Sequence, residues 1–189
     1  MKYEWKRRYI VGITGASGVV IGCRLVEQLL KRECRVDLVI TEAGCRVLKG
    51  EMGISGIEPE KGLKLYDIHD IGAPIGSGSV KTDGMIIAPC SMGTLGCIAN
   101  GISANLLQRA ADVVLKERRK LIIVPRETPL NTIHISNLLT LSNCGAVILP
   151  PVPAYYIRPK SIEDMINFII GKILDQLDIE HKLYTAYGN

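Results

Sequence analysis

The sequence predicts an α/β fold with a parallel sheet and helices on both of its faces. Short runs rich in β-branched residues alternate with longer segments of helical period, which is typical of strand–helix–strand units. The chain of 189 residues is long enough to bury one continuous core, and no linker or internal repeat divides it. We therefore expect residues 1–189 to form a single domain.

The individual elements can be predicted in order along the chain. The first strand is expected over 9–13 and the first helix over 19–30, because the apolar residues of 19–30 recur on one helical face. The glycine-rich segment 53–78 predicts a mobile loop region. Thr128 and Pro129 predict a helix start, as an N-cap followed by a first-turn proline. The other strands are expected at 36–40, 85–88, 121–124 and 146–149, and the helices at 43–49, 94–98, 105–116, 128–141 and 161–177.

The composition indicates which partners to expect. Hydrophobic residues make up 47% of the chain, so further burial between the subunits of a homo-oligomer is expected. The net charge of +4 comes from scattered basic residues, which argues against nucleic acid and favours a small anionic ligand. Six cysteines without metal-ligand spacing predict reduced thiols, no metal and a cytoplasmic location. No apolar run is long enough to predict a signal peptide or a membrane span.

Two segments that follow predicted strands carry small residues suited to an anionic ligand. Residues 12–18 read Gly-Ile-Thr-Gly-Ala-Ser-Gly, a turn that would direct backbone N–H groups toward a phosphate at a helix N-terminus. Its spacing differs from the dinucleotide fingerprint, and Thr41 stands where an acidic residue would close the second strand, so a mononucleotide fits better. Residues 89–94 read Pro-Cys-Ser-Met-Gly-Thr and place hydroxyl groups at the same sheet edge. The alternatives are a simple tight turn in the first segment and a helix cap in the second.

Charged side chains form two further groups. Arg109, Asp112 and Lys116 share one face of a predicted helix, where surface salt bridging is the alternative to anion binding. Arg126 and Glu127 stand between a buried strand and a predicted helix N-terminus, at the same sheet edge as the first glycine turn. An arginine there can clamp an anion through two hydrogen bonds, and a structural ion pair is the alternative.

Residues 150–156 combine three prolines with two adjacent tyrosines, Tyr155 and Tyr156. The stiff backbone can hold an aromatic ring over a cavity, with simple core packing as the alternative. The three histidines lie far apart in the sequence without a nucleophile motif, so the sequence predicts no catalytic triad.

Taken together, these segments resemble the UbiX-like flavin prenyltransferase family, once described as aromatic acid decarboxylases, over almost the whole chain. The resemblance implies a Rossmann-like (flavodoxin-like) domain that joins a dimethylallyl group from dimethylallyl monophosphate to N5 and C6 of reduced FMN, without a metal. The prenylated FMN would serve a partner decarboxylase, and the family suggests a homododecamer. The segments that carry the resemblance are 12–18, 77–79 (Ser-Gly-Ser), 88–91 (Ala-Pro-Cys-Ser), 109–119 (Arg-Ala-Ala-Asp-Val-Val-Leu-Lys-Glu-Arg-Arg), 125–129 (Pro-Arg-Glu-Thr-Pro) and 150–156.

The resemblance also implies roles for the matching residues. Ser17 and Glu51 would organise proton transfer near flavin N5. The residues implied to hold FMN are Gly15, Ala16, Ser17, Thr41, Ser91, Met92, Gly93, Thr94, Arg109 and Arg126. The residues implied to surround the prenyl phosphate are Lys116, Arg126, Glu127, Tyr156 and Lys172. The catalytic set is Ser17, Glu51, Lys116, Glu127 and Tyr156.

The sequence departs from the family at two points. Lys172 stands where most members have arginine, which keeps the positive charge and loses the bidentate geometry. The tail carries Tyr184 and Tyr187 where many members have a tryptophan, so one of these rings is expected to act as the aromatic lid. Two alternative functions are an FMN-dependent cysteine decarboxylase, which the segments 125–129 and 150–156 argue against, and a non-catalytic FMN carrier subunit of a decarboxylase.

Overall fold

The computed structural model describes residues 5–188, which form a six-stranded sheet with the order β3-β2-β1-β4-β5-β6. Every neighbouring pair of strands is parallel, which confirms the predicted fold class. Residues 1–4 and 189, the two ends of the expected domain, lie outside the described part. The strands are β1 (Arg7–Ile13), β2 (Cys34–Ile40), β3 (Leu63–Tyr66), β4 (Gly84–Cys90), β5 (Lys120–Pro125) and β6 (Val147–Ile148).

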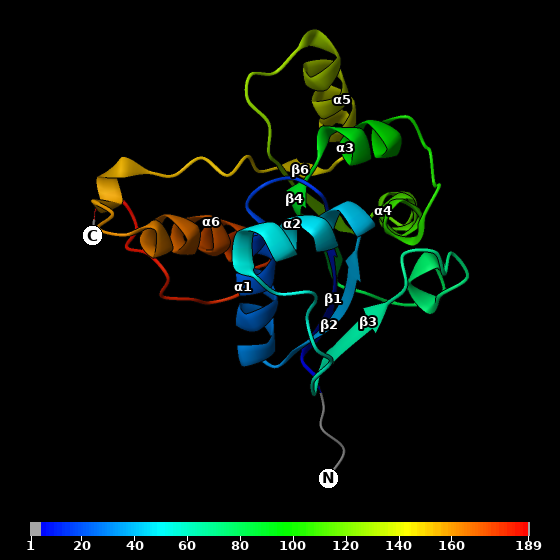
Figure 1. Ribbon diagram of the computed structural model, residues 1–189, viewed down its shortest axis with the longest axis horizontal. Helices are drawn as coiled ribbons and strands as arrows, with labels where there is room; N and C mark the ends of the chain where they lie inside the picture. Colours follow the sequence, from blue (N-terminus) through cyan, green and yellow to red (C-terminus); the bar gives the residue numbers. More distant parts are fainter. Residues whose placement is uncertain (1–4, 189) are drawn as a thin grey trace.

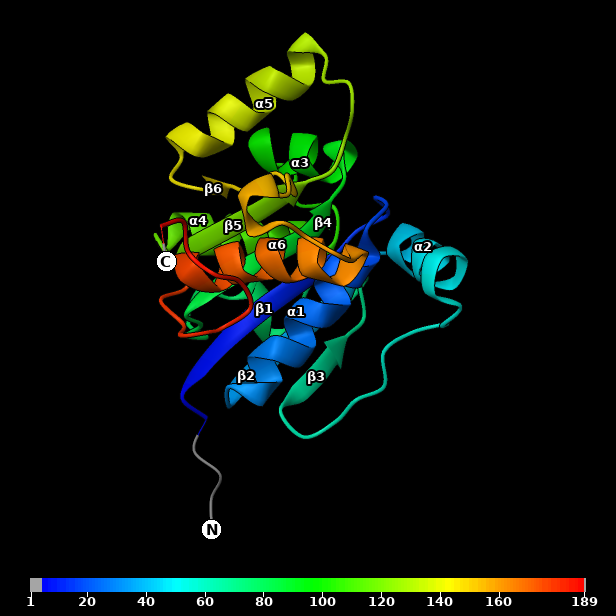
Figure 2. The ribbon, with the colours of Figure 1, turned by 90° about the vertical axis from the view of Figure 1, so that its left-hand side faces the viewer.

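Helices cover both faces of the sheet, because the strands alternate their apolar side chains between two cores. Val11 and Ile13 of β1 belong to the core under α1 (Val19–Lys31) and α6 (Ile162–Gln176), while Ile10 belongs to the core on the other face. Figure 2 shows α1 and α6 together on the near side of the sheet. The opposite core contains residues of α3 (Met92–Ala99), α4 (Leu106–Lys116) and α5 (Thr132–Asn143). The remaining helices are α2 (Glu42–Met52), η1 (Pro74–Gly76) and η2 (Tyr155–Ile157).

The strand order places a topological switch point between β1 and β4 (Figure 1). The chain adds β2 and then β3 on one side of β1, and it adds β4, β5 and β6 on the other side. In open parallel sheets, ligands bind outside the carboxyl ends of the strands at such a point. The loops that follow β1 and β4 are the two segments whose small residues the sequence analysis singled out.

Two predictions of local structure were wrong. The helix expected from Thr128 begins at Thr132, because Asn131 provides a better N-cap. The Asn131 side chain accepts a hydrogen bond from the His134 N–H at 2.8 Å, and the Asn131 N–H donates to the His134 ring at 3.4 Å. The strand β3 lies within the segment predicted as a loop, because the many glycines of that segment outweighed the short alternation of Leu63, Lys64 and Leu65.

The structure also describes the cysteines, the lengths of the helices and the grouping of possible metal ligands. All six cysteines are unpaired. Across residues 5–188, no helix is both long and apolar enough to cross a lipid bilayer. In the same part of the chain, no group of three or more His, Cys, Asp or Glu side chains is arranged to hold a metal ion.

Candidate functional site

Thr14 ties together the two loops at the switch point. Its side chain is fully buried, and its hydroxyl donates to the Pro89 carbonyl at 2.8 Å and accepts from the Ser91 N–H at 2.8 Å. Its own N–H donates to the same Pro89 carbonyl at 3.2 Å. Sequence reasoning did not single out Thr14, although a hydroxyl among glycine and apolar neighbours is the signal that identifies it. The glycine turn and the segment 89–94 therefore form one unit, as their common sheet edge predicted.

Replacing Thr14 with valine is expected to destabilise the protein by about 1–3 kcal/mol, because valine keeps the shape but leaves the Pro89 carbonyl without this donor and the partly buried Ser91 N–H without an acceptor. Urea unfolding of the two proteins measures the difference. Thr140→Val is the matched control, since the Thr140 hydroxyl only donates to the Ser136 carbonyl one turn earlier on exposed α5. Equal unfolding midpoints for the wild type and the Thr14 variant would contradict the role given to Thr14.

Glu51 belongs to the last turn of α2, and its side chain reaches the N-terminus of α1, next to Ser17. Its carboxylate accepts the Gly18 N–H at 2.9 Å and the Val19 N–H at 3.2 Å, where the helix dipole favours negative charge. Gly18 has φ of +92°, a left-handed conformation that favours glycine. These two amides were predicted to face a phosphate, and in this structure the carboxylate of Glu51 accepts from them. The glycine turn therefore binds an oxyanion, the carboxylate of Glu51. This contact places Glu51 next to Ser17, and these are the two residues for which the resemblance implies proton transfer.

The glycine turn also packs against the start of α2. A Cβ atom at Gly15 would lie 2.3 Å from the Cβ atom of Ala43, so no larger residue fits at this position. Thr41 is the N-cap of α2, because its hydroxyl accepts the Gly44 N–H at 3.0 Å. The Thr41 N–H in turn donates to the carbonyl of Ile13 at 3.0 Å. Gly15 and Thr41 therefore lie at the same edge of the sheet, where the resemblance implies FMN contacts.

Ser91 and Thr94 confirm the alternative of a helix cap. The Ser91 hydroxyl accepts the Thr94 N–H at 3.3 Å and donates to the Thr94 hydroxyl at 3.1 Å, at the N-terminus of α3. Met92 is buried beneath this turn, while Gly93 has no heavy atom within 4 Å of where its Cβ would be. The backbone at Gly93 is therefore open to an approaching ligand. Capping and ligand binding are compatible, because each hydroxyl retains a further hydrogen-bonding position.

Arg126 has a buried side-chain donor that makes no hydrogen bond with the described residues. Its backbone N–H donates to the Cys90 carbonyl at 3.1 Å, which fixes it beside the end of β4. Its side-chain Nε is buried and makes no hydrogen bond within residues 5–188. The alternative of a structural Arg126–Glu127 ion pair is wrong, because within the same range no such pair forms and Glu127 accepts the Thr128 N–H at 3.1 Å instead. Buried polar groups are nearly always satisfied, so Arg126 is a candidate to bind an acceptor atom of a ligand at this edge.

The first half of α4 confirms the alternative of surface salt bridging. Arg109 forms an ion pair with Asp112 at 3.0 Å, and its Nε donates to the carbonyl of Gly76 at 3.1 Å. Both charged side chains are more than a third exposed, so the pair itself contributes little stability. The contact with Gly76 holds the segment before β4 against the helix.

Lys116 and Ser17 lie at opposite ends of the strands: Ser17 follows the carboxyl end of β1, and Lys116 precedes the amino end of β5. It ends α4 shortly before Lys120 begins β5, so it is near the amino ends of the strands. Lys116 forms an ion pair with Glu117, and this hydrogen bond and charge hold the pKa of the Glu117 carboxyl below its ordinary value. A Cβ atom at Gly78 would lie 2.9 Å from Lys116 Nζ, so the cation is adjacent to the Ser-Gly-Ser segment 77–79.

Tyr156 and Lys172 lie on the face of the sheet covered by α6. The Tyr156 ring packs edge to face on Phe168 at 6.1 Å and on Tyr187 at 5.3 Å between ring centres. Tyr155 is 75% exposed and Tyr156 is 45% exposed, so neither ring belongs to the core. Lys172 Nζ is 3.2 Å from the carboxylate of Asp175. Of the two candidate lid residues, Tyr187 is the one that contacts Tyr156.

The predicted site residues thus fall into three groups within one chain. The edge group surrounds the switch point, and the α6 group lies on the face of the sheet covered by α6. The α4 group follows α4 from Arg109 near its start to Lys116 at its end, by the amino ends of the strands. The edge group is Gly15, Ala16, Ser17, Thr41, Glu51, Ser91, Met92, Gly93, Thr94, Arg126 and Glu127; the α4 group is Arg109 and Lys116; the α6 group is Tyr156 and Lys172.

Known proteins resemble this chain over nearly its full length. The family model named Flavoprotein matches residues 2–174. The flavin prenyltransferase UbiX of Alkalihalophilus pseudofirmus is 52% identical over 189 residues, which cover 94% of each protein. The crystal structure of AnUbiX in complex with FMN and dimethylallyl pyrophosphate has a TM-score of 0.91 and 40% identity, covering 97% of this chain and 98% of that one. A dodecameric FMN-dependent UbiX-like decarboxylase from Escherichia coli O157:H7 has a TM-score of 0.92 and 39% identity, covering 96% and 100%.

The cysteine decarboxylases are more distant. The FMN-dependent cysteine decarboxylase TvaF is 18% identical, with a TM-score of 0.59 over 76% of this chain and 89% of that one, so it shares the fold alone. The 52% identity with UbiX of Alkalihalophilus pseudofirmus, over 94% of this chain, is far higher than the 18% identity with TvaF. The chain belongs to the UbiX-like flavin prenyltransferases, within the Flavoprotein family.

Proposed function

We propose that this protein transfers a dimethylallyl group from dimethylallyl monophosphate to N5 and C6 of reduced FMN, and that a partner decarboxylase receives the prenylated FMN. Family membership over almost the whole chain carries this proposal. The relative AnUbiX forms a complex with FMN and dimethylallyl pyrophosphate, which supports FMN and a dimethylallyl phosphate ester as the ligand classes here. We also propose that 1–189 is one domain and, from its unpaired cysteines, that it is cytoplasmic.

The edge group fits the acceptor atoms of FMN. FMN carries a phosphate and ring carbonyls, and the unsatisfied Arg126 Nε would donate to one of them. The hydroxyls of Ser91 and Thr94 and the open backbone at Gly93 would provide further hydrogen bonds. Gly15 would help to position this edge for FMN, because the absence of a side chain lets the turn pack directly on Ala43 of α2. Reduced FMN, when bound, supplies the nucleophilic N5 and C6 atoms.

The cations of the chain would stabilise the leaving phosphate. As the C1–O bond of the donor breaks, negative charge grows on the phosphate and positive charge spreads over the allyl fragment. Lys116 and Arg126 would bind the phosphate more strongly as its charge increases, which lowers the barrier, while Lys172 would hold the donor phosphate equally before and during the reaction. The ring face of Tyr156 would attract the allylic cation. Glu51, with Ser17 beside it, would accept a proton that the flavin loses as the new bonds form.

A complete site would require more than one copy of the chain. Lys116 lies near the amino ends of the strands, while Glu51 lies beyond their carboxyl ends, so one chain presents them at opposite edges. The helix α5 stands beside α3 at the outer end of the molecule and exposes Ile133 and Leu139, at 69% and 60% (Figure 1). Apolar side chains exposed in this way favour contacts with another subunit. We propose a homododecamer, as in the Escherichia coli relative, with sites shared between copies.

Mixing two inactive variants tests the shared site. If Glu51 and Lys116 reach a site from different copies, co-expressing Glu51→Gln with Lys116→Ala is expected to restore activity at about one quarter of the sites. The restored sites would combine Glu51 of one copy with Lys116 of another. Prenylation by purified mixed oligomers measures this, with each variant alone as the control. Mixed oligomers as inactive as either variant would show that one copy supplies both residues.

The proposed reaction can be separated from its rivals by offering each substrate in turn. A flavin prenyltransferase is expected to convert reduced FMN and dimethylallyl monophosphate to a heavier flavin under anaerobic conditions. A cysteine decarboxylase would instead act on a peptide ending in cysteine with oxidised FMN, and a carrier subunit would bind FMN and change neither mixture. Mass spectrometry of the flavin and the peptide distinguishes the three outcomes, and a changed peptide with an unchanged flavin would overturn the proposal.

A further inference from the structure

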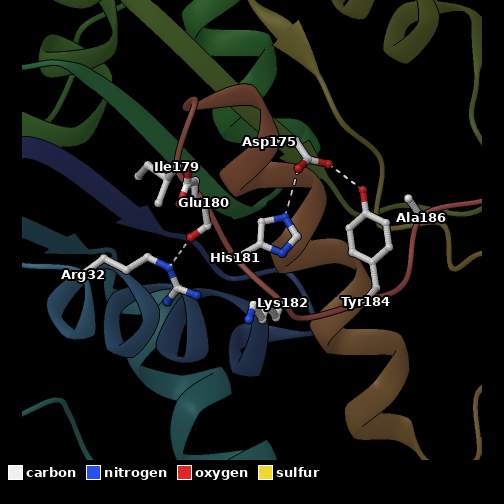
Figure 3. A pocket seen from close by; sticks show the side chains of 8 residues that line it. All are labelled: Arg32, Asp175, Ile179, Glu180, His181, Lys182, Tyr184 and Ala186. Atoms are coloured by element: carbon white, nitrogen blue, oxygen red, sulfur yellow. Dashed lines mark hydrogen bonds and ion pairs between the residues drawn. The ribbon is translucent and has the colours of Figure 1, made fainter. Parts of the chain in front are cut away.

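Asp175, near the end of α6, is the common acceptor for three side chains. The Tyr184 hydroxyl donates to it at 2.6 Å, the His181 Nε2 lies 2.9 Å from it, and Lys172 Nζ lies 3.2 Å from it. Figure 3 shows the carboxylate between the His181 ring and the Tyr184 hydroxyl. Two of these partners belong to the tail that follows α6, and the third belongs to the helix itself. One carboxylate therefore joins the helix to the tail.

The charges of this cluster are mutually stabilised. Burial opposes ionisation of Asp175, but hydrogen bonds from Tyr184, His181 and Lys172 outweigh it and hold the pKa of the carboxyl below its ordinary value. Burial also opposes the charge on Lys172, yet hydrogen bonds with Asp175 and Tyr184 leave the pKa of its amine above its ordinary value. Lys172 is thus a cation in a defined position, which suits a residue that binds phosphate.

The tail fits closely against α6 around this cluster. A Cβ atom at Gly171 would lie 2.5 Å from Cδ1 of Tyr184 and 2.8 Å from Cε1 of His181, so the helix needs glycine here. The Tyr184 ring also packs on Phe168 at 4.9 Å between ring centres. Just before His181, the Glu180 carbonyl accepts a hydrogen bond from Arg32, at the end of α1, at 3.1 Å. This contact lies beside a cavity of about 730 Å³ (Figure 3).

The same tail brings Tyr187 to Tyr156. Tyr187 follows Tyr184 by three residues, and its ring meets the Tyr156 ring edge to face at 5.3 Å. Tyr187 is 82% exposed, so little other than Tyr156 holds it in place. The position of this ring therefore depends on where the tail is anchored, which is the cluster around Asp175.

We infer that Asp175 is a positioning residue for the prenyl donor: it orients Lys172 and anchors residues 179–187 so that Tyr187 stands against Tyr156. This inference rests on the proposed function for the part that Lys172 and Tyr156 take in substrate binding. The anchoring of the tail is a property of the chain itself. It can be measured whether or not the protein transfers a prenyl group.

Asp175→Asn tests the inference in the assembled, FMN-loaded protein. Asparagine keeps the shape and removes the charge that orients Lys172 and His181. We expect KM for dimethylallyl monophosphate to rise about tenfold with little change in kcat, and amide hydrogen exchange in 179–187 to accelerate. Asp178→Asn is the matched control, because the Asp178 side chain is 82% exposed and, among the described residues, forms an ion pair with Lys120 alone. It should leave both measurements unchanged.

A second variant keeps the inference testable if Asp175→Asn fails to assemble. Gly171→Ala changes no charge and favours the helix, but its methyl group would displace Tyr184 and His181 from their positions. The same rise in KM and faster exchange in 179–187 are expected. Faster exchange with an unchanged KM would show that the cluster only supports the tail and would overturn the positioning role. Unchanged exchange in both variants would overturn the anchoring, and absence of prenylation in the wild type would count against the proposed function alone.

Discussion

Glu51→Gln is expected to lower kcat for prenylation by about 10²–10⁴-fold while FMN remains bound. Glutamine can still accept the N–H groups of Gly18 and Val19 through its carbonyl, so the turn should keep its shape. It cannot accept a proton, and it removes the negative charge beside Ser17. The loss should therefore appear in the chemical step. Single-turnover prenylation with pre-bound reduced FMN measures that step, and the flavin content of the purified protein reports binding.

Glu42→Gln is the matched control for this experiment. Glu42 is on the same helix, α2, and its exposed carboxylate contacts only His69, at 3.1 Å. Its loss is expected to leave both kcat and flavin content at wild-type values. Wild-type turnover by Glu51→Gln would refute the role of Glu51 in proton transfer, while loss of FMN from that variant would assign the carboxylate to flavin binding instead.

Lys116→Ala is expected to lower kcat by about 10²–10³-fold, again with FMN bound. The physical reason differs from that for Glu51→Gln. Lys116→Ala would remove one fixed positive charge that stabilises the leaving phosphate. Lys116→Arg should recover part of the rate, since it restores the charge with a different geometry. Release of inorganic phosphate under saturating dimethylallyl monophosphate measures the effect.

The control for Lys116→Ala is Arg118→Ala, which removes a cation from the same basic helix end. Arg118 lies outside the predicted site and is exposed. If the effect came from general attraction of an anionic substrate, both variants would lose activity to a similar degree, and the loss would vanish at high salt. A defect confined to Lys116 and insensitive to salt supports direct contact with the phosphate.

Most of the fold could be predicted because local pattern and burial agree. The β4 segment is apolar at nearly every position and is buried throughout, as a central strand of a parallel sheet must be. Ser161 was predicted to cap the last helix, and its hydroxyl accepts the Asp164 N–H there. The start of α5 could not be predicted correctly, because the sequence pattern favours Thr128 and Pro129, whereas the folded chain uses Asn131 as the N-cap.

The site was less accessible to sequence reasoning, because it depends on contacts between distant residues. The residue types at the switch point could be predicted from their place after β1 and β4. That the carboxylate of Glu51 would accept the amides of Gly18 and Val19 could not, since it requires the exact approach of α2 to α1. Nor does any local pattern show that Lys116 and Glu51 lie at opposite ends of the strands, because that depends on how α4 and α2 lie against the sheet.

Prenyl transfer to FMN is tested most directly by following both products of one anaerobic reaction with wild-type protein, reduced FMN and dimethylallyl monophosphate. Transfer of the prenyl group breaks one C–O bond of the donor for each flavin that is modified. Phosphate and the heavier flavin should therefore appear at the same rate and in equal amounts. Phosphate released without a change in flavin mass, or an unchanged flavin with no phosphate at all, would contradict prenyl transfer as the function of this protein.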